Sequence, residues 1–237
     1  MSEPVLIARG LRVTRGGRAI LRGVDIEARA GEVVGVLGPS GAGKSTLFRA
    51  LVGEALADEG TVVLGGRDVT RQALWKRARG GMGYVPQGPS VLWDLTVRGN
   101  LEAYRRVAGL AREEPRIAAA RVGLENRLDV RAGELSGGER RRLELARAAT
   151  RAPTILVCDE PFAGVDPAGA ERLGDLLSDL ARRGAAVLLA DHHVAEALRV
   201  CTRAVLLLDG VVAAACSAAD FPQHPLVRGR YLGTLGI

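Results

Sequence analysis

The segment with the clearest chemical pattern is the glycine-rich run Gly38-Pro39-Ser40-Gly41-Ala42-Gly43-Lys44-Ser45-Thr46. Glycines at these spacings let successive backbone N–H groups point inward around phosphate oxygens, and a following helix N-terminus adds positive potential. Lys44 would then bridge the outer phosphates, and the Ser45 hydroxyl would bind Mg²⁺. Because the run follows a strand-like segment (33–37) and precedes a helical one (47–56), we interpret it as a nucleotide-phosphate site rather than a structural glycine-rich turn.

A second chemical cluster, Asp159 and Glu160, directly follows the apolar run Thr154–Cys158. Ligands of open α/β sheets gather at the carboxyl ends of parallel strands, so these acids are expected near the phosphate loop. If the segment is extended, the two side chains point in different directions. We expect Asp159 to face Mg²⁺ and Glu160 to face an attacking water. A solvated acidic pair at a strand end is the alternative.

The elements that must position these groups alternate along much of the chain. Strand-like segments are expected at 5–8, 12–14, 19–26, 61–64, 82–86, 154–158, 185–190, 204–208 and 211–215. Helical patterns are expected at 168–183 and 194–200, and a helical region, interrupted only by Pro115 and a few glycines, runs from about 96 to 150. This alternation predicts an α/β fold with a mostly parallel sheet, and the helical region reads as a separate lobe.

Composition limits the class of protein. The chain has 237 residues, of which 47% are hydrophobic and 25% charged, as in an ordinary globular protein. No apolar run approaches the ~18 residues of a membrane-spanning helix. The N-terminus shows no basic segment followed by an apolar core, so we expect a cytoplasmic protein. The three cysteines form no CxxC pair and are interpreted as reduced, mostly buried thiols rather than a metal site.

The formal net charge is +6, which could attract nucleic acid or an anionic membrane face. We favour a solvated surface with dispersed arginines, because the basic residues spread along the whole chain and the aromatics form no stacking pattern. Only Lys44 and Lys76 are lysines among the 33 basic residues. Each of these two positions is therefore informative, since lysine and arginine differ chemically.

Six elements in order, spread over nearly the whole chain, resemble the ATP-binding subunit of an ABC transporter. They are the Gly38–Thr46 loop, Gln87, the Leu135–Glu139 segment, the Asp159-Glu160 pair, the segment around Asp166, and the histidines after Asp191. The resemblance implies a P-loop NTPase core with an N-terminal antiparallel β subdomain and an inserted helical subdomain. One ABC ATPase domain would span 1–237, with the core and β subdomain at 1–87 and 154–237. The helical subdomain would occupy 88–153 and end in the signature motif.

The resemblance also implies residue roles, with ATP and Mg²⁺ as ligands. Ser136, Gly137 and Gly138 would form the signature motif, which contacts ATP held by the opposite subunit. Two copies are therefore expected to form a homodimer in the ATP-bound state, and the segment containing Asp166 would cross its interface. Gln87 would reach Mg²⁺ and the water, although a plain surface glutamine is the alternative.

Two further positions are less well defined by the resemblance. A histidine should touch the γ-phosphate; His192 aligns best, with His193 as the alternative. Relatives usually stack adenine on an early aromatic residue, where this chain has Arg15, which can also lie flat on a base.

The subfamily is indicated by Ser136–Arg142, Asp159–Pro167, Asp191-His192-x-Val194 and the tail 227–233. These resemble the ATPase of the lipopolysaccharide export machine, and ATPases of branched-chain amino acid importers are the second candidate. Either would work with two integral membrane permease subunits, peripherally on the cytoplasmic face of the inner membrane. Residues 88–100 would receive the permease, with Trp93 as a hydrophobic anchor or an ordinary half-buried residue.

Other functional classes are less consistent with the chain. A soluble ABC ATPase acting on nucleic acid or ribosomes would normally have tandem cassettes or a long coiled-coil insertion, so no nucleic acid partner is expected. A regulatory module without catalysis conflicts with the intact acids Asp159 and Glu160.

Overall fold

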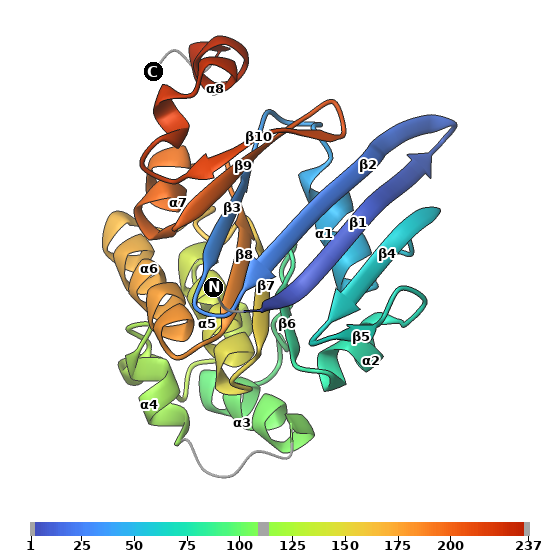
Figure 1. The fold of residues 1–237 in the computed structure, drawn as a ribbon. Helices are drawn as coiled ribbons and strands as arrows, with labels where there is room; N and C mark the ends of the chain where they lie inside the picture. The colour runs from blue at the N-terminus through green and yellow to red at the C-terminus, as the bar shows by residue number, and fades with distance from the viewer. Residues whose placement is uncertain (1–2, 109–113, 235–237) are drawn as a thin grey trace.

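The computed structural model describes residues 3–108 and 114–234 (Figure 1). Its strands are β1 Pro4–Arg15, β2 Arg18–Arg29, β3 Val33–Leu37, β4 Glu59–Leu64, β5 Arg67–Asp68, β6 Met82–Val85, β7 Ile155–Asp159, β8 Ala186–Ala190, β9 Arg203–Leu208 and β10 Val211–Ser217. Its α-helices are α1 Lys44–Val52, α2 Leu74–Arg79, α3 Val97–Ala108, α4 Pro115–Ala120, α5 Gly137–Thr150, α6 Pro167–Arg182, α7 Val194–Val200 and α8 Pro225–Arg230. Short 3₁₀ turns occupy Glu125–Arg127, Ala132–Glu134, Phe221–Gln223 and Leu232–Thr234.

The N-terminal strands form an antiparallel sheet in the order β2-β1-β4-β5. Strands β1 and β2 are joined by Gly16 and Gly17, both at positive φ, which suits the tight turn of a twisted hairpin. Alternate side chains such as Leu11, Val13 and Leu21 are buried, as expected for a sheet with one covered face. The predicted N-terminal antiparallel β region is confirmed.

The second sheet has six strands in the order β10-β9-β3-β8-β7-β6. All neighbours are parallel except β10, which pairs antiparallel with β9. Its central strands are buried on both faces, because α1 and the antiparallel sheet cover one side while α5, α6 and α7 cover the other (Figure 1). The predicted α/β architecture with a mostly parallel sheet is therefore confirmed.

The helical region between β6 and β7 contains α3, α4 and α5, and α5 packs against β6 and α6. The part of the predicted helical region at 109–113 lies outside the described residues. Helices α2 and α8 were not indicated by the sequence patterns. Within the described ranges, no helix combines the length and apolar character needed to cross a membrane.

Candidate functional site

The glycine-rich run forms the turn between β3 and the first residue of α1, Lys44. Gly43 has φ 105°, and a Cβ added there would lie 3.0 Å from the Leu21 Cδ2 atom. The backbone conformation and the close packing together explain why glycine is required. The Lys44 ammonium donates hydrogen bonds to the carbonyl oxygens of Gly38 and Pro39, at 2.7 and 2.9 Å. The lysine is thus held over the loop that precedes its helix.

Burial lowers the pKa of Lys44, while the negative charges of Glu160, Asp159 and Asp191 act in the opposite direction. These three acids stand at the carboxyl ends of β7 and β8. Strand β8 pairs with β3 in the parallel sheet, and β7 is the next strand beyond β8. The sheet therefore brings the lysine and the acids to one edge, as the strand order predicts.

Asp159 is the last residue of β7 and is only 2% exposed. Burial raises the pKa of its carboxyl, and a hydrogen bond with Ser45 acts in the opposite direction. A buried carboxylate beside a hydroxyl offers the hard oxygen ligands that Mg²⁺ prefers. Ser45 and Asp159 thus lie together as predicted, and their chemistry fits a magnesium ion.

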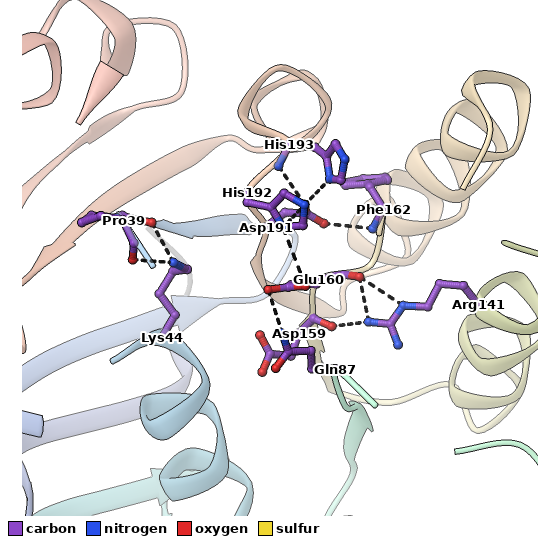
Figure 2. Close-up of polar contacts among 11 residues, drawn as sticks. Pro39, Lys44, Gln87, Arg141, Asp159, Glu160, Phe162, Asp191, His192 and His193 are labelled. Atoms are coloured by element: carbon purple, nitrogen blue, oxygen red, sulfur yellow. Dashed lines mark hydrogen bonds and ion pairs between the residues drawn. The ribbon is translucent and has the colours of Figure 1, made fainter. Parts of the chain in front are cut away.

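Glu160 does not continue the strand, which corrects the premise that the acidic pair is extended. Its φ is +55°, in the left-handed region, and its backbone N–H donates to Ala190 O at 2.7 Å. The side chain lies between Gln87 and His192 (Figure 2). Gln87 Nε2 donates to Glu160 Oε1 at 3.0 Å, and His192 Nδ1 lies 3.7 Å from Glu160 Oε2. The left-handed turn, rather than strand alternation, separates the two acids.

The two histidines have different surroundings. His193 Nδ1 lies 2.9 Å from Asp191 Oδ1, and the His193 backbone N–H donates to the same oxygen at 2.9 Å. Asp191 is fully buried and also accepts the Phe162 backbone N–H at 2.9 Å. The geometry thus ties His193 to Asp191 and leaves His192, 58% exposed at its side chain, facing Glu160.

Arg141 on α5 is a site residue that the sequence reasoning did not single out. It is 6% exposed and donates to the Pro86 and Glu160 carbonyl oxygens, at 2.6 and 2.8 Å, and also to Asp159 O (Figure 2). Its guanidinium forms an ion pair with Glu144 at 3.0 Å. The spacing i, i+3 of an arginine and a glutamate on the buried face of α5 is the sequence signal that could have found it.

The signature residues lie at the start of α5. Ser136 is the N-cap: its hydroxyl accepts the Glu139 N–H at 3.2 Å, and its own N–H donates to Glu139 Oε2 at 2.8 Å. A Cβ on Gly138 would lie 3.0 Å from Gly164 O. Gly138 therefore allows the signature turn to pack against the loop that precedes α6.

Asp166 is the N-cap of α6 and accepts the Gly169 N–H at 2.8 Å. That hydrogen bond holds the pKa of Asp166 below its usual range. Ser136 and Asp166 thus form a second cluster at two neighbouring helix N-termini. The first cluster comprises Lys44, Ser45, Gln87, Asp159, Glu160 and His192.

Arg15 and Trp93 lie outside these two clusters. Arg15 ends β1 at the tip of the hairpin, where it is exposed, and β2 of the same hairpin borders Gly43 through Ile20 and Leu21. Trp93 is 47% exposed, and the Arg140 guanidinium lies 5.2 Å from its ring centre. The adenine contact of Arg15 and the anchor role of Trp93 stay predictions.

Comparisons with known proteins agree with this geometry. The family model of the ABC transporter matches residues 21–163. A lipopolysaccharide export system ATP-binding protein LptB from Acidithiobacillus ferridurans is 40% identical, covering 98% of both chains. The protein of that name from Escherichia coli K12 is 37% identical, covering 96% of this chain and 97% of its own.

Solved structures lead to the same family. The ADP conformation of MJ1267, an ATP-binding cassette of an ABC transporter, superposes with a TM-score of 0.85 and 26% identity, covering 98% of this chain and 100% of that one. A structure of an ATP-binding subunit of an ABC transporter gives a TM-score of 0.84, also with 26% identity and 98% coverage of both chains. The chain belongs to the ABC transporter family, as one of its ATP-binding, ATP-hydrolysing subunits.

Proposed function

We propose that this protein powers the extraction and export of lipopolysaccharide from the inner membrane through ATP-driven closure of a homodimer. The observation that carries the cargo assignment is the group of nearly full-length relatives, 36–40% identical, whose names state lipopolysaccharide export. The geometry that carries the chemistry is the Glu160 carboxylate held between Gln87 and His192, at the same sheet edge as Lys44.

Hydrolysis follows from the placement of these side chains. Glu160 orients a water for attack on the γ-phosphorus and accepts its proton, while His192 contacts the γ-phosphate from the end of β8. Lys44 leaves its contacts with the loop carbonyls to neutralise the outer phosphates, and ADP departs with the electron pair of the broken P–O bond. Positioning and charge stabilisation supply most of the acceleration.

Mg²⁺ would be held by Ser45, Asp159 and Gln87, and when bound it neutralises phosphate charge. Gln87 donates to Glu160 through Nε2, so its amide oxygen is the atom left to bind a metal. Gln87 also precedes the helical region, since β6 ends at Val85 and α3 begins at Val97. A movement of the Gln87 side chain would therefore displace the start of the segment expected to meet the permease.

The second cluster completes the site of another copy. In the homodimer, Ser136, Gly137 and Gly138 of one chain contact the ATP bound by the opposite chain, with the Asp166 segment crossing between them. The Ser136 hydroxyl and the first N–H groups of α5 form an anion site of the kind that helix N-termini provide. We expect Glu160→Gln to bind ATP, to stall hydrolysis and to accumulate as a dimer in sedimentation experiments. A variant that stays monomeric with ATP, or that hydrolyses it at the normal rate, would remove this scheme.

A groove of about 320 Å³ on the surface is suited to the permease subunits. It lies between α2, β6, α3 and α5, and its lining includes Leu74, Ala78, Tyr104 and Ala148. Ser90, at the start of the segment expected to receive the permease, also lines it. If each chain of the homodimer receives one of the two integral membrane subunits in this groove, the ATPase is held peripherally on the cytoplasmic face of the inner membrane.

The cargo is tested by isolating the protein from its native membrane together with whatever copurifies. A pair of lipid-export permeases, with ATPase activity stimulated by lipopolysaccharide, is the expected result. A pair of amino-acid permeases would instead assign the chain to the branched-chain importers.

A further inference from the structure

Helix α2 presents an exposed tryptophan with two cations beside it. Trp75 is 55% exposed, although burial of a large aromatic ring would stabilise the protein. The Lys76 ammonium lies 5.4 Å from the centre of its ring, and the Arg79 guanidinium lies 5.1 Å from it. An indole flanked by cations is the combination found where proteins meet the membrane–water interface.

The same two cations line a surface hollow of about 540 Å³. Arg67 of β5 closes it from the other side, and Gln72 contributes a polar amide. Every ionisable residue in its lining is basic, and none of the three cations forms an ion pair with an acid of the described residues. The nearby Asp68 instead accepts the Thr70 N–H at 2.8 Å. A concave site with three cations that have no acidic partner among the described residues is complementary to a phosphate group.

Helix α2 separates the basic hollow from the groove assigned to the permease. Leu74 and Ala78 line the groove assigned to the permease, whereas Lys76 and Arg79 line the basic hollow. Helix α2 is therefore a ridge between the two, at the side of the molecule where β5 and β6 lie (Figure 1). If a membrane subunit occupies the groove, the ridge lies beside it and faces the same bilayer.

We propose that Trp75 and the hollow formed by Arg67, Lys76 and Arg79 bind the phosphate headgroups of anionic phospholipids. The orientation toward the bilayer rests on the proposed function, but the chemistry of the site does not. Lipid is favoured over an acidic protein segment because an exposed indole lies within 5.4 Å of both cations, and an indole beside cations suits the headgroup layer. Lys76 is one of only two lysines in the chain, and the other, Lys44, lies in the phosphate loop.

The test is binding of the full chain, without nucleotide or permease, to vesicles of phosphatidylcholine and of phosphatidylcholine with about one-third phosphatidylglycerol. We expect binding only to the anionic vesicles. Lys76→Gln/Arg79→Gln should weaken it by about 25-fold, because each cation near an anionic surface contributes roughly fivefold. The matched control Arg116→Gln/Arg199→Gln removes the same charge from exposed positions on α4 and α7 and should retain most of the binding.

Fluorescence places Trp75 directly. The chain has two tryptophans, so Trp93→Phe leaves Trp75 as the sole indole. Its emission should shift to the blue on anionic vesicles and should be quenched by lipids brominated near the headgroup. In the Trp75→Phe variant the remaining indole is Trp93, and its emission should neither shift nor be quenched on the same vesicles.

Several outcomes would overturn the proposal. Equal weakening by the control variant would indicate diffuse attraction of a basic protein. Displacement by inorganic phosphate beyond a chloride control of matched ionic strength would assign a soluble phosphate. Binding of an acidic peptide with no binding of vesicles would assign a protein partner. Because no permease is present, failure here together with successful copurification removes only the lipid site.

Discussion

Asp159 illustrates how single residues at this site trade stability for chemistry. Its carboxylate ends a fully buried strand, and burial raises its pKa from the ordinary value of 3.8. The folded protein therefore holds the proton of Asp159 more tightly than the unfolded chain does. Stability falls as the pH rises through 3.8 and then through the raised pKa, because the folded state must accommodate a desolvated charge.

Asp159→Asn should therefore stabilise the nucleotide-free protein at neutral pH, by about 1 kcal/mol, while weakening Mg²⁺-dependent ATP binding. The gain in the free energy of unfolding should grow as the pH rises through the raised pKa and should vanish below 3.8. Urea denaturation across this pH range measures it. Asp175→Asn, at an exposed position of α6, is the control and should show neither effect. A destabilised Asp159→Asn would mean that Ser45 and Arg141 already stabilise the charge fully.

Substitutions of His192 and His193 should have different effects, one on hydrolysis and the other on stability. His192→Ala should lower kcat by about 10²-fold with little loss of stability, because its ring faces Glu160 from an exposed position. His193→Ala should keep hydrolysis within about twofold but lower the free energy of unfolding by about 1 kcal/mol, since Asp191 loses one hydrogen-bond partner. Steady-state ATPase rates and urea midpoints distinguish the two. The reverse pattern would assign the γ-phosphate contact to His193.

These residues also show how far sequence reasoning reaches at this scale. The proximity of Lys44 and Ser45 to Asp159 and Glu160 was predictable, because it depends on residue type, local spacing and the carboxyl edge of a parallel sheet. The left-handed conformation of Glu160 was not, since a glutamate carries no local signal for positive φ. The i, i+3 spacing of Arg141 and Glu144 could have indicated a buried ion pair, but the contacts of Arg141 with backbone carbonyls of two distant segments leave no signal in the sequence.

At the scale of elements, α5 connects the two clusters of the site. Its first residues follow the Ser136 cap, and Arg141, one turn further on, donates to the carbonyl oxygens of Glu160 and of Pro86, which lie on two separate segments. Glu144 accepts from Arg141 on one side and from the Ser90 hydroxyl, at 3.2 Å, on the other. Helix α5 is therefore bonded both to the loop that contains Glu160 and to the segment before α3.

Arg141→Lys should lower kcat by about 10²-fold and leave Mg²⁺-ATP affinity nearly unchanged, since one ammonium cannot serve carbonyls on two segments. Arg141→Met should in addition destabilise the fold by about 3 kcal/mol, because Glu144 is left buried without its cation. The double variant Arg141→Met/Glu144→Gln should regain stability without regaining kcat. If hydrolysis recovers together with stability, Arg141 is structural only.

Most strands and helices were predictable because apolar periodicity reports burial. The segments 33–37 and 194–200 match β3 and α7 to the residue. Helix α2 was not predicted, because its anchor in the core is a charged residue. Arg77 is 1% exposed and donates to the carbonyl oxygens of Ala50, Leu51, Thr70 and Gln72. A helix held by hydrogen bonds to the end of α1 leaves no hydrophobic pattern to read.

At the scale of the whole molecule, the site is divided between two surfaces. Lys44, Asp159 and Glu160 gather at the carboxyl edge of the parallel sheet, whereas Ser136 and Asp166 stand at the N-termini of α5 and α6. In a dimer with a two-fold axis, the sheet edge of each chain would face the helix N-termini of the other chain, so two such contacts would form. Each composite site then takes its loop from one chain and its signature from the other.

This division predicts complementation between two inactive variants. Lys44→Ala damages the phosphate loop, and Ser136→Glu damages the signature, so each homodimer should be inactive. A mixed dimer contains one doubly damaged site and one intact site. An equimolar mixture should therefore recover about a quarter of the wild-type ATPase rate, since half of the dimers are mixed and each has one working site. Mixing at constant total protein, with sedimentation to verify exchange, measures it. If each ATP site were formed by one chain alone, the ATPase rate would not recover at any ratio of the two variants.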